Sequence, residues 1–304
     1  MIPESPTETE LEQLTQTAIT AALEAAAYIA DQADRTHKVE RKSEAASLAS
    51  EVFTEVDLRS EEIIINALKE SLTKFGLGLL TEESEDDLSR FEKRAFWCID
   101  PLDGSLPFIE GRPGFAVSIA LVSKGGRSLL GVIADPSTGR LYQARSGNGA
   151  TLLTNDSESV WQLDQTPPEP GRLNIFADRS FSSEEGYRRI LERLELAAYE
   201  FGLHGIHVVA ESGGALNAIR CIEKAPAVYF KRPKLTHGGG SLWDFAASAC
   251  IVHEAGGVAS AFDGSPLPLN RPDSTYMNKA GVLYASTPDL AEAVRDACKT
   301  TPDQ

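Results

Sequence analysis

An apolar run ends in two aspartates in the stretch FWCIDPLDGSLPF, at residues 96–108. Asp100 and Asp103 follow the predicted strand FWCI, Pro101 stiffens the turn between them, and the next residue, Gly104, permits unusual backbone angles. Two carboxylates this close repel each other, and away from water they need a compensating cation. Oxygen ligands in a tight turn suit Mg²⁺ or Mn²⁺ rather than zinc. For this motif alone, a surface turn that only caps a helix is an equal alternative.

Length and charge limit the classes of protein that this chain can represent. Its 304 residues suit one large domain or two modest lobes. The formal net charge of −16 predicts repulsion from nucleic-acid backbones and anionic membranes. The N-terminus lacks the pattern of a secretory signal, and the cysteine spacing favours buried free thiols in a reducing compartment. We therefore expect a cytoplasmic protein with no nucleic-acid or membrane partner.

Helical and strand periodicities alternate along the chain and predict a layered α/β (α+β) fold. Thr7 and Glu10 have capping-box spacing ahead of a long first helix, and a second helix is predicted from about Ser60 to Lys74. Two apolar runs, at 115–122 and 129–135, predict a hairpin. The Pro/Gly-rich stretch DQTPPEPGR at 164–172 is the best boundary between lobes. The expected lobes are 1–165, with most metal ligands, and 166–304. A polar segment at 35–50 is expected to be a mobile loop.

Further acidic residues lie at the ends of other predicted elements. Glu82 and Glu83 in TEES follow an apolar run, and Asp57 precedes the second helix. Asp244 lies at the start of the long apolar helix LWDFAASACIVHEAGG, where an aspartate alone is more often an N-cap. Taken together with the DPLDGS turn, these residues favour a shared polynuclear metal site.

Four motifs make the chain resemble a known family, the inositol monophosphatase superfamily of Mg²⁺-dependent, lithium-sensitive phosphomonoesterases. They are TEVD (54–57), EES (82–84), DPLDGS (100–105) and WDFAASACIVHEAGG (243–257), in the order that the family has them. The resemblance covers nearly the whole chain. It implies a layered αβαβα sandwich with two lobes and with the active site between them.

The same resemblance implies a set of metal ligands. Glu82, Asp100, Asp103 and the backbone carbonyl of Leu102 would hold a first ion, and Asp100, Asp103 and Asp244 would hold a second. The cofactor would be Mg²⁺, as two or three ions, with Mn²⁺ as a possible substitute. The choice of Glu82 over its neighbour rests on alignment alone.

Catalytic roles also follow from the resemblance. Asp57 and Ser105 would form a dyad that, with Glu82, activates the attacking water. The backbone N–H groups of Gly104 and Ser105 would donate to the phosphate. The family usually has threonine where this chain has Ser105, so the hydroxyl is kept while the methyl group that restricts its rotamer is lost.

Substrate choice depends on the C-terminal half. The stretch YMNKAGVLYAS at 276–286 resembles the 3'(2'),5'-bisphosphate nucleotidase branch more than the inositol branch. In SGGALNAIRCIE, at 212–223, that branch has a lysine where this chain has Asn217, which weakens the grip on a second phosphate. We expect Gly213 and Asn217 to bind substrate.

A basic cluster lies just before Asp244, in FKRPKLTHGGGSLWD. We expect Lys231 and Arg232, helped by Lys234 and His237, to form a cationic rim that attracts a multiply charged anion. A solvated basic loop is an equally good interpretation of this segment.

These observations predict a metal-dependent phosphomonoesterase that acts on a small phosphorylated metabolite. The first candidate is a bisphosphate nucleotidase that converts 3'-phosphoadenosine 5'-phosphate to AMP and phosphate. The alternative is a phosphatase of inositol 1-phosphate or another sugar phosphate. A catalytically silent metal- or phosphate-binding module is the competing class. The protein is expected to be a monomer or a homodimer.

Overall fold

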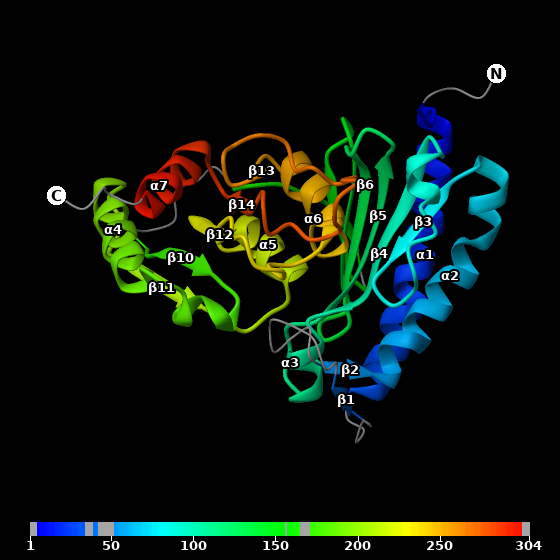
Figure 1. The fold of residues 1–304 in the computed structure, drawn as a ribbon, viewed down its shortest axis with the longest axis horizontal. Helices are drawn as coiled ribbons and strands as arrows, with labels where there is room; N and C mark the ends of the chain where they lie inside the picture. Colours follow the sequence, from blue (N-terminus) through cyan, green and yellow to red (C-terminus); the bar gives the residue numbers. More distant parts are fainter. Residues whose placement is uncertain (1–4, 34–38, 42–51, 156, 165–170, 300–304) are drawn as a thin grey trace.

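Helices and sheets alternate in five layers in the computed structural model, which describes residues 5–33, 39–41, 52–155, 157–164 and 171–299 (Figure 1). A seven-stranded sheet and a five-stranded sheet are separated and flanked by helices. The helical layers are α1 (Glu8–Gln32) with α2 (Glu55–Phe75), α5 (Gly214–Glu223) with α6 (Leu242–Glu254), and α4 (Tyr187–Glu200) with α7 (Pro288–Cys298). The αβαβα architecture predicted from the sequence is therefore confirmed.

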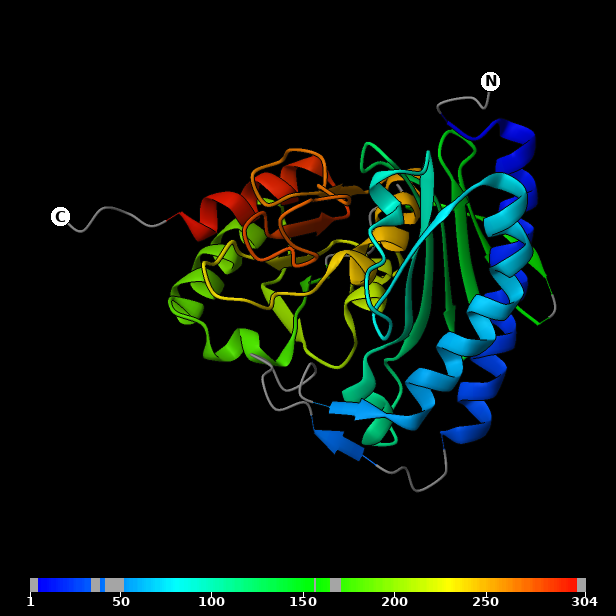
Figure 2. The same ribbon diagram turned by 45° about the vertical axis from the view of Figure 1, so that its right-hand side comes forward.

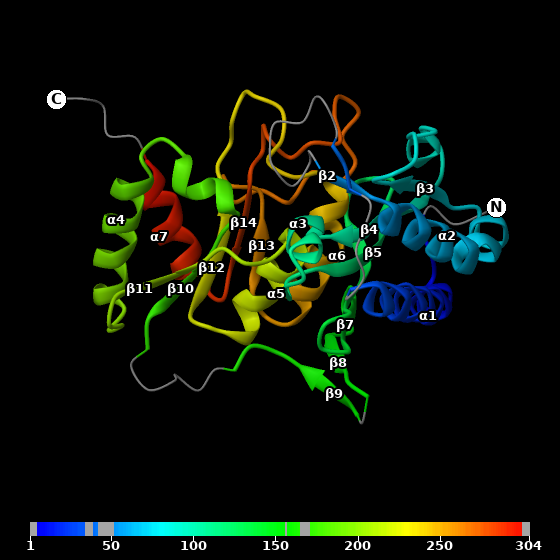
Figure 3. The ribbon, with the colours of Figure 1, turned by 90° about the horizontal axis from the view of Figure 1, so that it is seen from below.

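The larger sheet has the strand order β3-β4-β5-β6-β7-β8-β9. Its strands are β3 (Gly78–Thr81), β4 (Ala95–Asp103), β5 (Ala116–Ser123), β6 (Ser128–Asp135), β7 (Arg140–Arg145), β8 (Ala150–Leu153) and β9 (Glu158–Trp161). β3 pairs in parallel with β4, and all other pairs are antiparallel, including the predicted hairpin β5–β6. The central strands are buried on both faces because α1 and α2 cover one face and α6 covers the other (Figure 3).

The smaller sheet has the strand order β11-β10-β12-β14-β13. Its strands are β10 (Leu173–Phe176), β11 (Ile206–Val209), β12 (Ala227–Lys231), β13 (Val258–Ser260) and β14 (Val282–Ala285). β10 is parallel to both β11 and β12, while β14 is antiparallel to its two neighbours. A separate core joins this sheet to α4 and α7 on its outer face.

Among the element boundaries that differ from the sequence prediction, two affect the acidic residues. α2 begins at Glu55 rather than near Ser60, because the buried i, i+4 spacing of its inner face extends back to Val56. β4 continues to Asp103, and its pairing with β5 is irregular between Asp100 and Asp103. The proline between these aspartates has no N–H for the ladder, so the chain bulges there instead of leaving the sheet as a free turn.

Shorter elements complete the described chain. The hairpin of β1 (Val39–Arg41) and β2 (Val52–Thr54) lies beside α3 (Ser105–Ile109) at one end of the larger sheet (Figure 2). Most of the loop predicted at 35–50 and most of the predicted lobe boundary lie outside the described residues. We propose the same division into lobes, 1–165 and 166–304. Among the described residues, no helix is long and apolar enough to cross a membrane.

The predicted capping box of α1 is present and is tied to the sheet. Thr7 accepts a hydrogen bond from the backbone of Glu10, and the Glu10 carboxylate accepts one from the backbone of Thr7. Arg94, just before β4, also donates to both Glu10 oxygens, at 3.2 and 2.8 Å. These hydrogen bonds, led by that from Arg94, lower the pKa of Glu10 to about 2. The bidentate pair thus joins the first turn of α1 to the start of β4.

Glu10→Gln should lower the free energy of unfolding by about 1–2 kcal/mol at pH 7, after allowance for solvent screening. The folded-state pKa lies below the unfolded value, so this stability is present above pH 4.5 and disappears as the pH falls toward 2. Urea unfolding of both proteins between pH 7 and pH 2 measures the difference. Glu12→Gln, at an exposed position on the same helix, is the control. An equal loss of stability in Glu10→Gln and Glu12→Gln would contradict the stabilising role of the Glu10–Arg94 pair.

Candidate active site

The bulge at the end of β4 positions the two aspartates of the DPLDGS motif. Asp100 is 1% exposed and Asp103 is 5% exposed, so both carboxylates are buried. The backbone N–H of Leu102 donates to Asp100 Oδ1 at 3.1 Å and fixes the orientation of that side chain. Asp100 pairs with Ser118 and Asp103 pairs with Ala116, so both aspartates stay on a rigid, buried strand on either side of the irregularity.

Three acidic side chains converge at this end of the sheet. One carboxylate oxygen from each of Glu82, Asp100 and Asp244 lies within 4.8 Å of the other two. Glu82 follows β3, which is parallel to β4, so the two strands end at the same edge of the sheet. Asp244 comes from the first turn of α6, where Ser241 is the N-cap and donates its N–H to Asp244 Oδ2 at 2.7 Å. Asp244 therefore belongs to a capping box and to the acidic cluster at once.

The electrostatics of this cluster fit a hard cation. Burial holds the pKa of Asp100 well above its usual range, and the negative charges of the neighbouring carboxylates raise it further. Burial also raises the pKa of Asp244, although the cation of Lys231 opposes the rise. Carboxylates held together away from water need a positive charge between them, and a donor set made only of oxygen suits Mg²⁺. The residues present therefore fit the metal that the sequence predicts.

Asp103 lies beside this cluster and has other partners in the structure. Its two oxygens accept hydrogen bonds from the backbone N–H groups of Gly214 and Ala215, both at 2.9 Å, at the start of α5. Burial raises the pKa of Asp103 to about 7, against the effect of these two amides. A side chain at Gly213 would collide with the Asp103 carboxylate. Gly213 therefore permits this close approach, and the role of Asp103 as a metal ligand stays a prediction.

The structure brings the predicted dyad together. Ser105 Oγ lies 3.3 Å from Asp57 Oδ1 and 3.2 Å from the carbonyl oxygen of Leu102. Asp57 is buried in the first turn of α2, and Ser105 opens α3. Gly104 adopts the left-handed region, with φ 85°, and a Cβ there would lie 2.7 Å from the carbonyl oxygen of Gly114. This glycine is required for the tight connection that aims Ser105 at Asp57.

The first two cations of the predicted basic cluster, Lys231 and Arg232, point to opposite faces of the strand and have different partners. Lys231 Nζ lies 2.7 Å from Asp178 Oδ2 and 5.2 Å from the centre of the Phe245 ring. Burial would lower the pKa of Lys231, but the negative charges of Asp178 and the acidic cluster outweigh it and raise the value. Arg232 instead pairs with Glu184 at 2.9 Å, because adjacent residues at the end of a strand point to opposite faces. Only Lys231 of this pair is placed to act on the acidic cluster.

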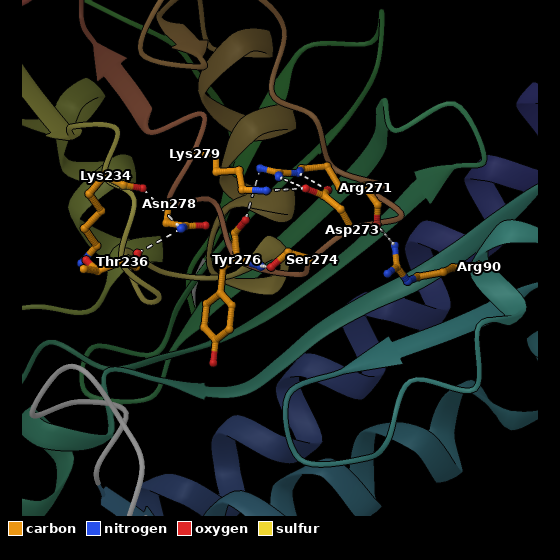
Figure 4. A network of polar contacts seen from close by, with 9 residues as sticks. All are labelled: Arg90, Lys234, Thr236, Arg271, Asp273, Ser274, Tyr276, Asn278 and Lys279. Carbon is orange, nitrogen blue, oxygen red and sulfur yellow. Dashed lines mark hydrogen bonds and ion pairs between the residues drawn. The ribbon is translucent and has the colours of Figure 1, made fainter.

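The rest of the basic segment is a loop fastened to the segment around residue 276. The backbone carbonyl of Asn278 accepts a hydrogen bond from the backbone N–H of Lys234 at 2.7 Å. The side-chain amide of Asn278 donates to the carbonyl of Thr236 at 3.0 Å (Figure 4). The rings of His237 and Tyr276 pack edge to face at 5.5 Å. Lys234 and His237 are exposed. The loop is therefore held through its backbone and through the His237 ring, and the side chains of Lys234 and His237 lie at the surface.

Asn217 is fully buried in α5. Its side-chain amide donates to the carbonyl of Ser212 at 3.0 Å, and its Oδ1 has no hydrogen-bond partner among the described residues. The structure thus places Asn217 as a brace for the loop before α5. A substrate contact for this residue stays a prediction.

Two acidic residues that the sequence analysis did not single out contact the site. Asp178 follows β10 and binds both Lys231 and the hydroxyl group of Tyr229, at 3.1 Å for the latter. Its signal in the sequence is the same as that of Asp100, an aspartate directly after an apolar strand. Glu61 lies one helical turn after Asp57 on α2 and contacts Ser84 of the EES motif. A buried glutamate inside an ordinary helix has no distinctive sequence signal.

Comparisons with known proteins agree with this geometry. The sequence model of the Inositol monophosphatase family matches residues 10–300. Inositol-1-monophosphatase of Synechocystis sp. is 28% identical over 298 residues, which cover 96% of this chain and 91% of that protein. Nus factor SuhB of Vibrio cholerae is 27% identical over 277 residues, which cover 91% of this chain and 92% of that protein.

A solved structure of extragenic suppressor protein suhB from Bartonella henselae superposes with a TM-score of 0.70 and 24% identity, and the match covers 94% of this chain and 98% of that chain. This likeness supports the fold. The match of the family model over nearly the whole chain supports the function class. The chain therefore belongs to the inositol monophosphatase family, and it is a metal-dependent hydrolase of phosphoric monoesters.

Proposed function

We propose that this protein hydrolyses a small polyol monophosphate, such as inositol 1-phosphate, with Mg²⁺ as its cofactor. The observation that carries the proposal is the convergence of Glu82, Asp100 and Asp244 within 4.8 Å on buried, rigid elements. The relative from Synechocystis, named an inositol-1-monophosphatase, supports this substrate class. The bisphosphate nucleotide, which the sequence motifs placed first, becomes the second candidate because neither curated relative described above carries that name.

In this proposal, Glu82, Asp100 and Asp244 hold the metal, with Asp103 and the Leu102 carbonyl as further ligands. Bound Mg²⁺ supplies positive charge that activates water and stabilises the charge developing on the phosphoryl group. The number of ions, two or three, and the use of Mn²⁺ belong to the same proposal.

The dyad acts on the proton of the attacking water. Ser105 Oγ accepts this proton while its own proton passes to Asp57 Oδ1, 3.3 Å away. The backbone N–H groups of Gly104 and Ser105, at the start of α3, donate to the phosphate. The carbonyl oxygen of Gly114 lies so close to this turn that Gly104 has no room for a side chain.

One observation favours the second candidate substrate. Lys231 is a cation facing the acidic cluster, where it can attract a leaving group that carries an additional negative charge. Two observations weigh against this substrate. Arg232 is engaged by Glu184, and Asn217 offers no positive charge.

Phosphate release from a panel of substrates tests the substrate class. Inositol 1-phosphate should be hydrolysed faster than 3'-phosphoadenosine 5'-phosphate in Mg²⁺, and EDTA should abolish both activities. Lys231→Met should reduce activity on the nucleotide more than on the inositol phosphate. A strong preference for the nucleotide would reverse the order of the candidates, and no turnover of any phosphomonoester would favour a silent binding module.

Asp100→Asn should remove at least about 99% of the activity, because a neutral amide binds Mg²⁺ much more weakly than a carboxylate. In EDTA the variant should unfold at a higher temperature than the native protein, because a buried negative charge has been removed. Added Mg²⁺ should stabilise the native protein far more than the variant. Glu85→Gln, at an exposed position nearby, is the control, and native turnover in Asp100→Asn would refute the proposed metal centre.

Ser105→Ala should lower kcat about 100-fold, because the hydroxyl that relays the proton to Asp57 is lost. Ser105→Thr should keep or increase kcat, because the added methyl group restricts the rotamer without removing the hydroxyl. Steady-state kinetics at saturating Mg²⁺ compare the two variants. Equal activity in the alanine and threonine variants would exclude the hydroxyl from the reaction.

A further inference from the structure

The first two turns of α2 contact three separate segments of the site. Asp57 binds Ser105 at the start of α3, and Ser60 Oγ donates to the Pro101 carbonyl at 2.8 Å. Glu61 Oε2 accepts a hydrogen bond from Ser84 Oγ at 3.0 Å. Residues spaced by three and four share one face of a helix, so α2 presents a continuous polar face to the ends of β3 and β4.

Glu61 is the charged member of this face that no predicted role explains. It is 5% exposed, and burial raises the pKa of its carboxyl group. Besides Ser84 Oγ, the backbone amides of Glu83 and Ser84 hydrogen-bond to this carboxyl group. Its Oε1 has no hydrogen-bond partner among the described residues. Burying a carboxylate adds little to the stability of the fold by itself. The role of Glu61 therefore depends on the groups that this carboxylate holds in position.

The segment that Glu61 holds carries the proposed metal ligand Glu82. On one side this loop is fixed by the backbone N–H of Glu82, which donates to the Ile99 carbonyl of β4 at 3.2 Å. On the other side it is fixed by the donors of Glu83 and Ser84, which converge on Glu61. A carboxylate suits this place because it accepts hydrogen bonds and presents no donor of its own.

We infer that Glu61 is a positioning residue of the metal centre, which orients Glu82 toward the other acidic side chains by anchoring the residues that follow it. The inference rests on the proposed function, because it assumes that Glu82 is a ligand. Glu61 itself lies outside the group of oxygens that converge within 4.8 Å. Its effect is therefore expected on the affinity for the metal and not on the chemical step.

Glu61→Gln tests this role, because glutamine keeps the size of the side chain but removes the negative charge that the donors of Glu83 and Ser84 face. The Mg²⁺ concentration that gives half of the maximal rise in Tm should increase about tenfold, as for other groups that orient metal ligands. The Mg²⁺ concentration for half-maximal activity should rise in parallel. At saturating Mg²⁺ kcat should stay within about twofold, and Tm in EDTA should be unchanged or higher.

The next residue provides a matched control. Glu62 is exposed and pairs with Arg59 on the same helix, so Glu62→Gln should leave the Mg²⁺ dependence unchanged. Ser84→Ala removes one donor to Glu61 at an exposed position and should shift the Mg²⁺ dependence in the same direction by a smaller amount. This variant also provides the test if Glu61→Gln does not fold.

The outcomes separate this inference from the proposed function. A Mg²⁺-dependent rise in Tm that is identical in native protein, Glu61→Gln and Ser84→Ala would overturn the positioning role alone. If Glu61→Gln has a lower Tm in EDTA but an unchanged Mg²⁺ midpoint, Glu61 stabilises the fold and does not position the metal ligand. No rise in Tm with Mg²⁺ in the native protein would instead overturn the metal centre, and the positioning role would fall with it.

Discussion

The concentration of buried negative charge at the end of β4 is the constraint on which the rest of the site depends. Three carboxylates within 4.8 Å repel one another and lack the solvation that water would provide. Such an arrangement persists only where the surrounding structure holds each group in place. Part of the folding free energy of the five layers therefore offsets the repulsion between these side chains, which would otherwise separate.

Each carboxylate is held by a different element, and the five-layer arrangement brings these elements to one place. β3 and β4 end side by side because they are parallel neighbours in the larger sheet. α6 lies between the two sheets, so its first turn delivers Asp244 to the same edge. The start of α5 offers two backbone amides to Asp103, which reduces the cost of burying that charge. Lys231, a cation that faces this region, is supplied by the smaller sheet.

Much of the site was predictable from the sequence because its residues lie at the ends of apolar runs. An aspartate or glutamate that follows a buried strand is conspicuous, and so is one that starts an apolar helix. This explains why Asp100, Glu82 and Asp244 could be proposed from the sequence. Asp178 carries the same signal and was recognisable in principle. Glu61 was not, because a glutamate within an amphipathic helix is ordinary until the tertiary structure buries it.

The layered fold class, most helices and strands, and the family of the chain could be inferred from the sequence alone, because apolar periodicity and the four motifs depend only on local order. Tertiary structure decided which polar groups meet. The bulge at Pro101, the pairing of Asp103 with α5 and the opposite directions of Lys231 and Arg232 follow from packing between distant segments. Contacts of this kind depend on how two sheets and three helical layers stack, which no local pattern in the sequence encodes.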